Sequence, residues 1–299
     1  MKIYFVWGPG GVGKTHLAIY AGTRPEDSNQ ARALMTLDPS NRAFELPGVP
    51  PYLTLKKIDA NSLFEDLAKK MPTNAKVQAF YQKMVSGLRE FRDYLSLIQL
   101  SDELNKSDSD LIVVDTPPLE EAVGLHRSVK NLRTFFGTYL VQIALQSTRF
   151  SLVQISFKKA FEMSRFFIGK RAAETVLELI EWLTQHRERF ETASHFLEQI
   201  FNSRESNHIF VLTPESPESL LAEIKTNFKE TQNISFYLNQ SVFEFRMEMP
   251  EAYERETKLI SKIKKAFPKS QIQLIPLQIM GDDTEEEMTR FLRSKAIRV

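Results

Sequence analysis

The chain has 299 residues, of which 42% are hydrophobic, enough apolar material for the core of one large domain or two smaller ones. Lysine and arginine (39) nearly balance aspartate and glutamate (38), so no strong charge favours nucleic acid or an acidic membrane surface as the main partner. Cysteine is absent, which excludes disulfides, thiolate zinc sites and thiol chemistry, and no uncharged apolar run reaches membrane-spanning length.

The chain opens on an apolar run at residues 3–6, which predicts a first strand. This strand leaves no room for a signal peptide, so we expect a cytoplasmic protein.

The segment that follows this strand, residues 8–15, reads GPGGVGKT and precedes an apolar helical pattern. Glycines let backbone N–H groups cradle phosphate oxygens, and the helix N-terminus adds a positive dipole end. Lys14 would reach the β- and γ-phosphates, and the hydroxyl of Thr15 would bind Mg²⁺. A glycine-rich turn that matches the pattern by chance is the alternative, which the position after a first strand disfavours. We therefore predict binding of ATP with Mg²⁺, and the cofactor-binding residues expected here are Gly8, Gly10, Gly11, Val12, Gly13, Lys14, Thr15 and His16.

A second predicted strand, residues 33–37, ends at Asp38. Open α/β sheets bind ligands at the carboxyl ends of their strands, so Asp38 is a candidate for orienting the attacking water. The alternative is a turn or helix-capping aspartate before Pro39.

The next segments alternate between strand and helix patterns. Residues 52–55 predict a short strand, residues 61–100 predict helices, and residues 101–110 read as a charged loop. The unbroken apolar run 111–114 predicts a central parallel strand, which delivers Asp115 toward the phosphate loop. A second Mg²⁺ carboxylate is expected there, usually acting through water. A capping aspartate before the Pro-Pro turn is the weaker alternative.

Residues 120–202 are mostly helical in pattern and rich in phenylalanine. Two apolar stripes, at 173–183 and 190–201, predict a pair of helices that pack as a hairpin. The dense apolar segment 135–167 is interpreted as core packing, and an exposed groove for a partner or client helix is the alternative.

The sheet pattern returns in the last third of the chain, with strands predicted at 208–212, 234–238 and 272–276, the last of the sheet. Ser216 is expected to cap a helix, residues 251–267 to form an amphipathic helix, and Asp283 to open a terminal helix. Asn239 follows the middle strand, where its amide suits recognition of a purine, although an ordinary loop asparagine is equally consistent with the residue alone.

Three segments together carry a family resemblance: GPGGVGKTHLA at 8–18, TLDPSNRAF at 36–44 and VVDTPPLEEAV at 113–123. In this order they resemble the arsenite-pump and tail-anchored-protein targeting ATPases, a family of dimerising P-loop ATPases. Weaker similarity continues through the helical middle, VLTPESPESL, YLNQS and the final Ile-Pro. The resemblance implies an α/β fold, with a mostly parallel sheet flanked by helices in one P-loop ATPase domain (residues 1–299) that carries an inserted, mostly helical subdomain at 120–206.

The resemblance also implies roles for individual residues. Asp38 would position or activate the water, Asp115 would sense Mg²⁺ and the γ-phosphate, and residues 10–15 would hold the phosphates. Asn239 and the loop after Pro276 would contact adenine. The implied catalytic residues are Asp38, Lys14 and Asp115, and the implied metal site is Thr15, Asp38 and Asp115.

Two departures from the family pattern change the expected function. Pro9 occupies the position of a lysine that, in the family, crosses a dimer interface to the partner's phosphates, so hydrolysis is slow, another residue substitutes, or a homologous partner supplies the lysine. The absence of cysteine excludes arsenite binding through thiols and a CxxC zinc clasp.

Three functions stay open at this point. The first is a Mg-dependent ATPase switch that forms a homodimer or heterodimer and acts on a protein client through the helical subdomain, with no nucleic acid and at most an indirect link to a membrane. The second is a spatial-positioning, partition-like ATPase. The third is a regulatory subunit with little turnover of its own.

Overall fold

In the computed structural model, the described residues are 1–23, 31–38, 42–46, 49–63, 89–119, 121, 188–189, 191–228, 231, 233–276 and 297–298. The chain divides into two compact units. The first unit comprises Met1–Ile58, Lys106–Val123 and Gln199–Val299, and the second comprises Asp59–Asn105 and Gly124–Glu198. The expected insertion at 120–206 stays a prediction.

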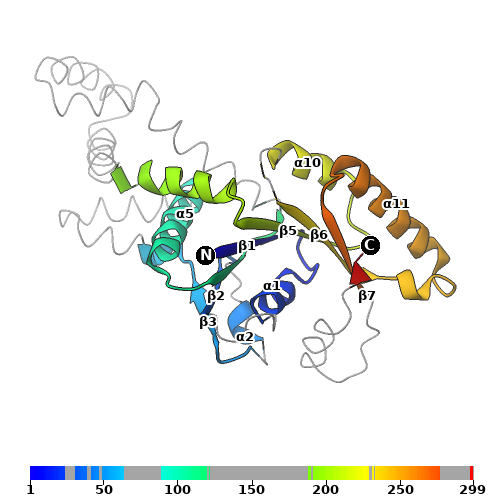
Figure 1. Cartoon of the computed structure of the whole chain (residues 1–299), viewed down its shortest axis with the longest axis horizontal. Coiled ribbons are helices and arrows are strands. Elements are labelled where there is room, and N and C mark those ends of the chain that lie inside the picture. Colours follow the sequence, from blue (N-terminus) through cyan, green and yellow to red (C-terminus); the bar gives the residue numbers. More distant parts are fainter. Residues whose placement is uncertain are drawn as a thin grey trace, which may run out of the picture. The chain divides into compact units, whose positions relative to one another are not determined.

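The first unit is built on one eight-stranded sheet (Figure 1). Its strands are β1 (Lys2–Trp7), β2 (Arg32–Thr36), β3 (Leu53–Lys57), β4 (Leu111–Asp115), β5 (Ser206–Leu212), β6 (Ile234–Ser241), β7 (Gln271–Pro276) and β8 (Ile297–Arg298). They lie in the order β3-β2-β4-β1-β5-β6-β7-β8, and all pairs are parallel except β7 with β8. The mostly parallel α/β sheet is confirmed. The expectation that residues 272–276 form the last strand is wrong, because β8 adds an antiparallel strand to β7.

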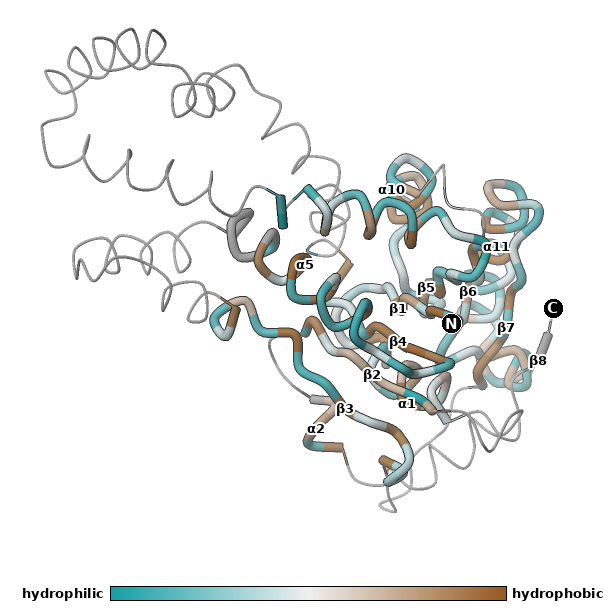
Figure 2. Tube along the Cα trace, turned by 60° about the vertical axis from the view of Figure 1, so that its left-hand side comes forward, coloured by the Kyte–Doolittle hydropathy of each residue, from teal (hydrophilic) through white to brown (hydrophobic). Residues whose placement is uncertain are grey.

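Burial explains why β1 and β4 lie in the middle of the sheet. All five residues of β4 are buried, and the second half of β1 is buried too, as expected for strands covered on both faces. Most of β4 is accordingly coloured hydrophobic in Figure 2. In the register, Asp115 lies opposite Val6 of β1 and opposite Thr36 of β2. The carboxyl ends of three strands therefore meet beside the start of the glycine loop.

An aromatic cluster beside β1 fixes the orientation of one buried histidine. The indole Nε1 of Trp7 donates to Nδ1 of His208 over 3.1 Å, and Nε2 of His208 lies 3.1 Å from the carbonyl oxygen of Phe201. Because an indole N–H only donates, Nδ1 must accept and the ring proton lies on Nε2. All three side chains are buried, so this chain of hydrogen bonds is sealed from water.

Two local predictions are wrong. Helix α5 (Arg89–Lys106) continues through most of the expected loop, because buried Ser101 and Leu104 extend its buried stripe beyond Leu97. Within the second unit, Asp102 of this helix forms an ion pair with Arg189.

The second wrong prediction concerns Ser216. Helix α10 (Ser219–Asn227) begins later than expected, with Glu218 at its N-cap position. The hydroxyl of Ser216 instead accepts a hydrogen bond from the backbone N–H of Thr213 over 2.9 Å, so it closes the turn that follows β5.

Helix α11 (Pro250–Ala266) confirms the expected amphipathic helix and its single buried stripe, which consists of Ala252, Glu256, Leu259 and Ile263. It lies beside α10 (Figure 1). The carboxylate of Glu218 forms ion pairs with Lys258 and Lys262 across the two helices. The expected helices over 64–88, most of the phenylalanine-rich middle and the terminal helix from Asp283 lie outside the described residues.

Candidate nucleotide-binding site

The glycine loop joins β1 to α1 (Lys14–Thr23), and close packing requires glycine at two of its positions. A Cβ on Gly8 would lie 2.4 Å from the carbonyl oxygen of Val211, so only glycine lets the loop approach β5 this closely. Gly13 has φ +86°, and a Cβ there would lie 2.7 Å from Nδ2 of Asn239. The loop is therefore held against β5 at one end and against a β6 side chain at the other.

Lys14 folds back over this loop. Its side chain is 7% exposed, and Nζ donates to the carbonyl oxygen of Pro9 over 2.8 Å. Lys14 and the start of α1 line one cavity, which has a volume of about 380 Å³. The residues that line it are Gly10, Gly11, Gly13, Lys14, Thr15, His16, Asp38, Leu46, Pro118, Asn239 and Gln240. A cationic side chain and a helix N-terminus at one cavity suit a polyphosphate.

Asp115 lies directly behind Thr15. It is 1% exposed, and its Oδ2 accepts the hydroxyl of Thr15 over 3.0 Å. Burial raises the pKa of this carboxyl from 3.8 to about 7, with Asp38 also raising it, against the lowering effects of the Thr15 hydrogen bond and the positive charge of Lys14. In the part of the chain that the structure describes, Oδ1 has no hydrogen-bond donor. A second cation close to this carboxyl would stabilise its charged form.

The donor set fits Mg²⁺. The hydroxyl of Thr15 and the carboxylate of Asp115 are oxygen ligands, and the unpartnered Oδ1 remains available as an acceptor, directly or through water. Across the described ranges, no group of three or more histidine or acidic side chains gathers that would hold a metal by itself. Mg²⁺ is commonly held by one or two carboxylates together with the phosphates of a nucleotide.

Asp38 reaches the cavity from the end of β2. It is half-buried, and its backbone N–H donates to Oγ1 of Thr36 over 3.2 Å, which fixes the first residues after the strand. Since the carboxylate lines the cavity together with Lys14 and Thr15, the structure brings together the three side chains that the sequence placed at the phosphates.

The segment after Asp115 is attached to the glycine loop. Oγ1 of Thr116 donates to the carbonyl oxygen of Val6 over 2.8 Å, and the backbone N–H of Leu119 donates to the carbonyl oxygen of Gly8 over 2.9 Å. Pro118, between them, lines the cavity.

The sequence predicted that Asn239 follows the end of its strand, but the residue lies within β6. Its Nδ2 donates to the carbonyl oxygen of Val12 over 2.9 Å, so it contacts the glycine loop across 227 residues of sequence. Gln240, which follows it, has φ +58°, the one positive φ of a non-glycine residue in the described backbone. Pro276 ends β7 opposite Ser241, and the loop after it lies outside the described residues.

Four predicted site residues do not line the cavity. Of the expected cofactor-binding residues, Gly8 packs on β5, Val12 belongs to the hydrophobic core, and Pro276 ends β7. Asp115, expected as a catalytic and metal-binding residue, lies behind Thr15. Three lining residues were missed: Leu46, Pro118 and Gln240. Pro118 was within a recognised motif, whereas nothing in the sequence distinguishes Leu46 or the unusual backbone of Gln240.

In the ranges that the structure covers, there is no helix with the length and hydrophobicity needed to span a membrane.

The family model described as anion-transporting ATPase matches residues 1–294. A protein of Aquifex aeolicus (strain VF5), named putative arsenical pump-driving ATPase 2, is 26% identical over 254 residues, which are 78% of this chain and 74% of that protein. The chain therefore belongs to the anion-transporting ATPase family, whose members are nucleotide-hydrolysing P-loop ATPases.

Proposed function

We propose that this protein is a Mg-dependent ATPase whose nucleotide state controls a protein partner or client. One observation carries the proposal: Lys14, Thr15 and Asp38 line one cavity, and Asp115 lies hydrogen-bonded to Thr15 behind it. These groups supply a cation for phosphate, a hydroxyl and a carboxylate for a metal, and a second carboxylate at the phosphate end.

The chemistry is mainly positioning and electrostatics. Lys14 would exchange the carbonyl oxygen of Pro9 for phosphate oxygens, and the loop N–H groups would share the charge. Thr15 and Asp115 would hold Mg²⁺, which supplies positive charge against the phosphates when it is bound. Asp38 would orient the attacking water and accept its proton.

Asn239 is proposed to read the base. One N–H of its Nδ2 donates to the carbonyl oxygen of Val12, and the second N–H is the proposed donor to N7 of adenine. Its Oδ1 is the proposed acceptor for the amino group of adenine. Pro276 would bring the following loop near the same base, as the resemblance implies.

The hydrogen bonds of Thr116 and Leu119 to β1 and the glycine loop are the proposed route from nucleotide to partner. They connect the phosphate site to the segment that leads into the predicted subdomain at 120–206. The working form is proposed to be a homodimer or a heterodimer with a homologous ATPase in the cytoplasm, with the client bound through that subdomain and no nucleic acid involved.

Pro9 favours a second candidate, a nucleotide-binding subunit with little turnover of its own. Without a cation at this loop position, an isolated homodimer would lack the charge that in this reaction class accelerates phosphoryl transfer by roughly a thousandfold or more.

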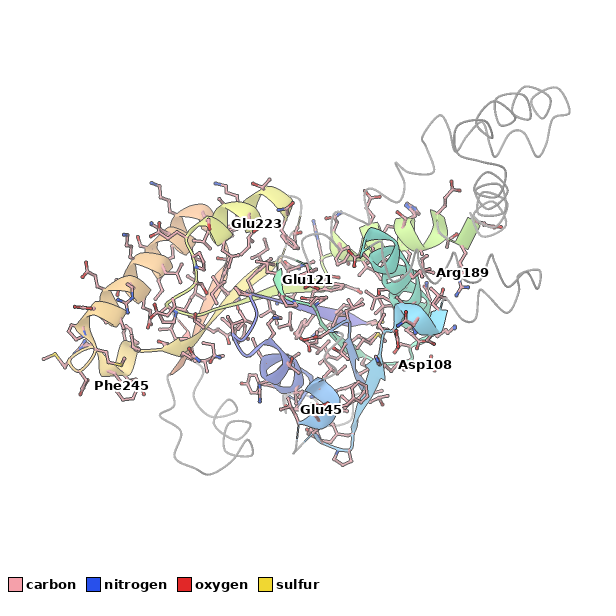
Figure 3. The ribbon with its side chains drawn as sticks, turned by 180° about the vertical axis from the view of Figure 1, so that it is seen from behind. Glu45, Asp108, Glu121, Arg189, Glu223 and Phe245 are labelled. Carbon is pink, nitrogen blue, oxygen red and sulfur yellow. The ribbon has the colours of Figure 1, made fainter. Side chains whose placement is uncertain are left out.

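Steady-state phosphate release with Mg·ATP, measured over a range of protein concentrations, tests both candidates. The variants are Asp38→Asn, Pro9→Lys and, as a matched control, Asp108→Asn at an exposed aspartate labelled in Figure 3. The first proposal expects activity per chain that rises with concentration, is lost in Asp38→Asn and is unchanged in Asp108→Asn.

The outcomes separate the two candidates. Binding of ATP without phosphate release at any concentration contradicts a self-sufficient ATPase and supports the low-turnover subunit, above all if Pro9→Lys restores release. Equal rates in wild type and Asp38→Asn would contradict the role of Asp38.

A further inference from the structure

A carboxylate lies in the buried stripe of α11, where an apolar side chain would be ordinary. Glu256 is 0% exposed. Its Oε1 accepts the hydroxyl of Ser241 over 2.6 Å, and its Oε2 accepts the backbone N–H of Val242 over 2.7 Å. Burying a carboxylate is unfavourable unless such bonds compensate it, so this position is specialised for holding residues 241–242.

The held residues follow directly on a strained bend. Gln240 has φ +58°, a conformation in which a residue with a Cβ is crowded and which relaxes unless its surroundings hold it. At the same place the register between β6 and β7 shifts, between Leu238 and Ser241. Ser241 stiffens the bend further, because its Oγ also accepts the backbone N–H of Phe243 over 3.3 Å.

The bend determines where Asn239 lies. Asn239 precedes Gln240, its Nδ2 donates to the carbonyl oxygen of Val12, and both residues line the cavity. If residues 241–242 were released, Gln240 would return to negative φ, and the preceding peptide would rotate and carry Asn239 away from the glycine loop. The turn η2 (Phe243–Phe245), labelled at Phe245 in Figure 3, follows the bend and leads to α11.

We propose that Glu256 is a positioning residue for base recognition: by holding Ser241 and Val242 it keeps the strained bend, and thereby keeps Asn239 at the base. The inference rests on the proposed function, since it gives Glu256 a role in reading adenine through Asn239. Glu256 itself touches no ligand and takes no part in the chemistry.

Titration calorimetry on the full chain tests this with two probes, Mg·ADP and Mg·pyrophosphate, of which only the first carries a base. Glu256→Ala should weaken binding of Mg·ADP by about tenfold, the scale of one or two lost hydrogen bonds, and leave Mg·pyrophosphate within about twofold. Asn239→Ala should have the same effect. The double variant should bind Mg·ADP no more weakly than the weaker-binding of the two single variants, because both substitutions remove the same interaction with the base. Glu254→Ala, at an exposed glutamate of the same helix, should change neither affinity.

Two further variants distinguish the proposed role of Glu256 from a general loss of folding. Glu256→Gln should restore Mg·ADP binding to within about threefold, since its amide donates to Ser241 while its oxygen accepts from Val242. Ser241→Ala removes one anchor and should give a smaller loss than Glu256→Ala, again confined to Mg·ADP.

Each contrary result has one meaning. If wild type binds Mg·ADP no more tightly than Mg·pyrophosphate, base reading by Asn239 is wrong, and the proposed function loses its nucleotide specificity. If wild type prefers Mg·ADP but folded Glu256 and Ser241 variants lose both probes equally, or keep both, the positioning role alone is overturned. Additive losses in the double variant overturn it as well.

Discussion

Replacing Asp115 by asparagine should stabilise the nucleotide-free protein, and more so as the pH rises. The folded-state pKa of Asp115 lies above its ordinary value, because burial disfavours the charged form. Folding therefore favours the protonated carboxyl, and the free energy of unfolding falls as the pH rises from the ordinary pKa to the folded one. Asparagine removes that dependence and keeps an oxygen for the hydroxyl of Thr15.

The size of the effect follows from the two pKa values. A rise from 3.8 to about 7, at about 1.36 kcal/mol per pKa unit, amounts to about 4 kcal/mol once the carboxyl is ionised above pH 7. Near pH 5.5 the folded protein still holds the proton, so only about half of this penalty is present. We expect the stability gained by Asp115→Asn to be larger by about 2 kcal/mol at pH 8 than at pH 5.5.

Urea unfolding at both pH values, without nucleotide or Mg²⁺, measures this difference, with Asp108→Asn as the exposed control. The same variant should lose the Mg²⁺-dependent part of its affinity for ADP, because the metal loses an anionic ligand. A stability difference that is equal at the two pH values would refute the reasoning, since it would show that Asp115 does not titrate in this range.

Three other substitutions test separate features. Gly13→Ala should lower the free energy of unfolding by roughly 1–3 kcal/mol and weaken nucleotide binding, because alanine would have to adopt a positive φ and its Cβ would displace Asn239. Urea unfolding measures the first effect and calorimetry the second. His208→Phe should cost roughly 2–4 kcal/mol in urea unfolding, because phenylalanine can neither accept from the buried indole N–H of Trp7 nor donate to the carbonyl oxygen of Phe201, and a smaller cost would show that these hydrogen bonds are not sealed from water. Lys14→Met should weaken Mg·ADP binding in calorimetry by roughly tenfold to a hundredfold, and unchanged affinity would remove Lys14 from the phosphate site.

Strands and the phosphate loop were predictable from the sequence because their signals are local. An apolar run, four glycines and a lysine stand next to one another at 3–14, and an unbroken apolar run marks β4. A strand buried on both faces has few polar positions, so an unbroken apolar run indicates a central strand of the sheet.

Helix boundaries were less predictable. Residues 101–110 are polar enough to read as a loop, yet α5 runs on to Lys106 because Ser101 and Leu104 are buried. Ser216 has the residue type of a helix cap, but its hydroxyl closes a turn instead. In both cases the residue types allow two local structures, and packing selects one.

Local sequence patterns were enough to predict the α/β class, the phosphate loop and the acidic residues at the ends of β2 and β4, since each depends on neighbours in the chain. How these parts meet depends on contacts between distant segments. The register of β1, β2 and β4 puts Thr15 against Asp115 across 100 residues, and the approach of β6 puts Asn239 on Val12 across 227. The bend at Gln240 and the carboxylate of Glu256 behind it left no sequence signal, because a left-handed glutamine and a buried glutamate exist only where distant segments supply their hydrogen bonds.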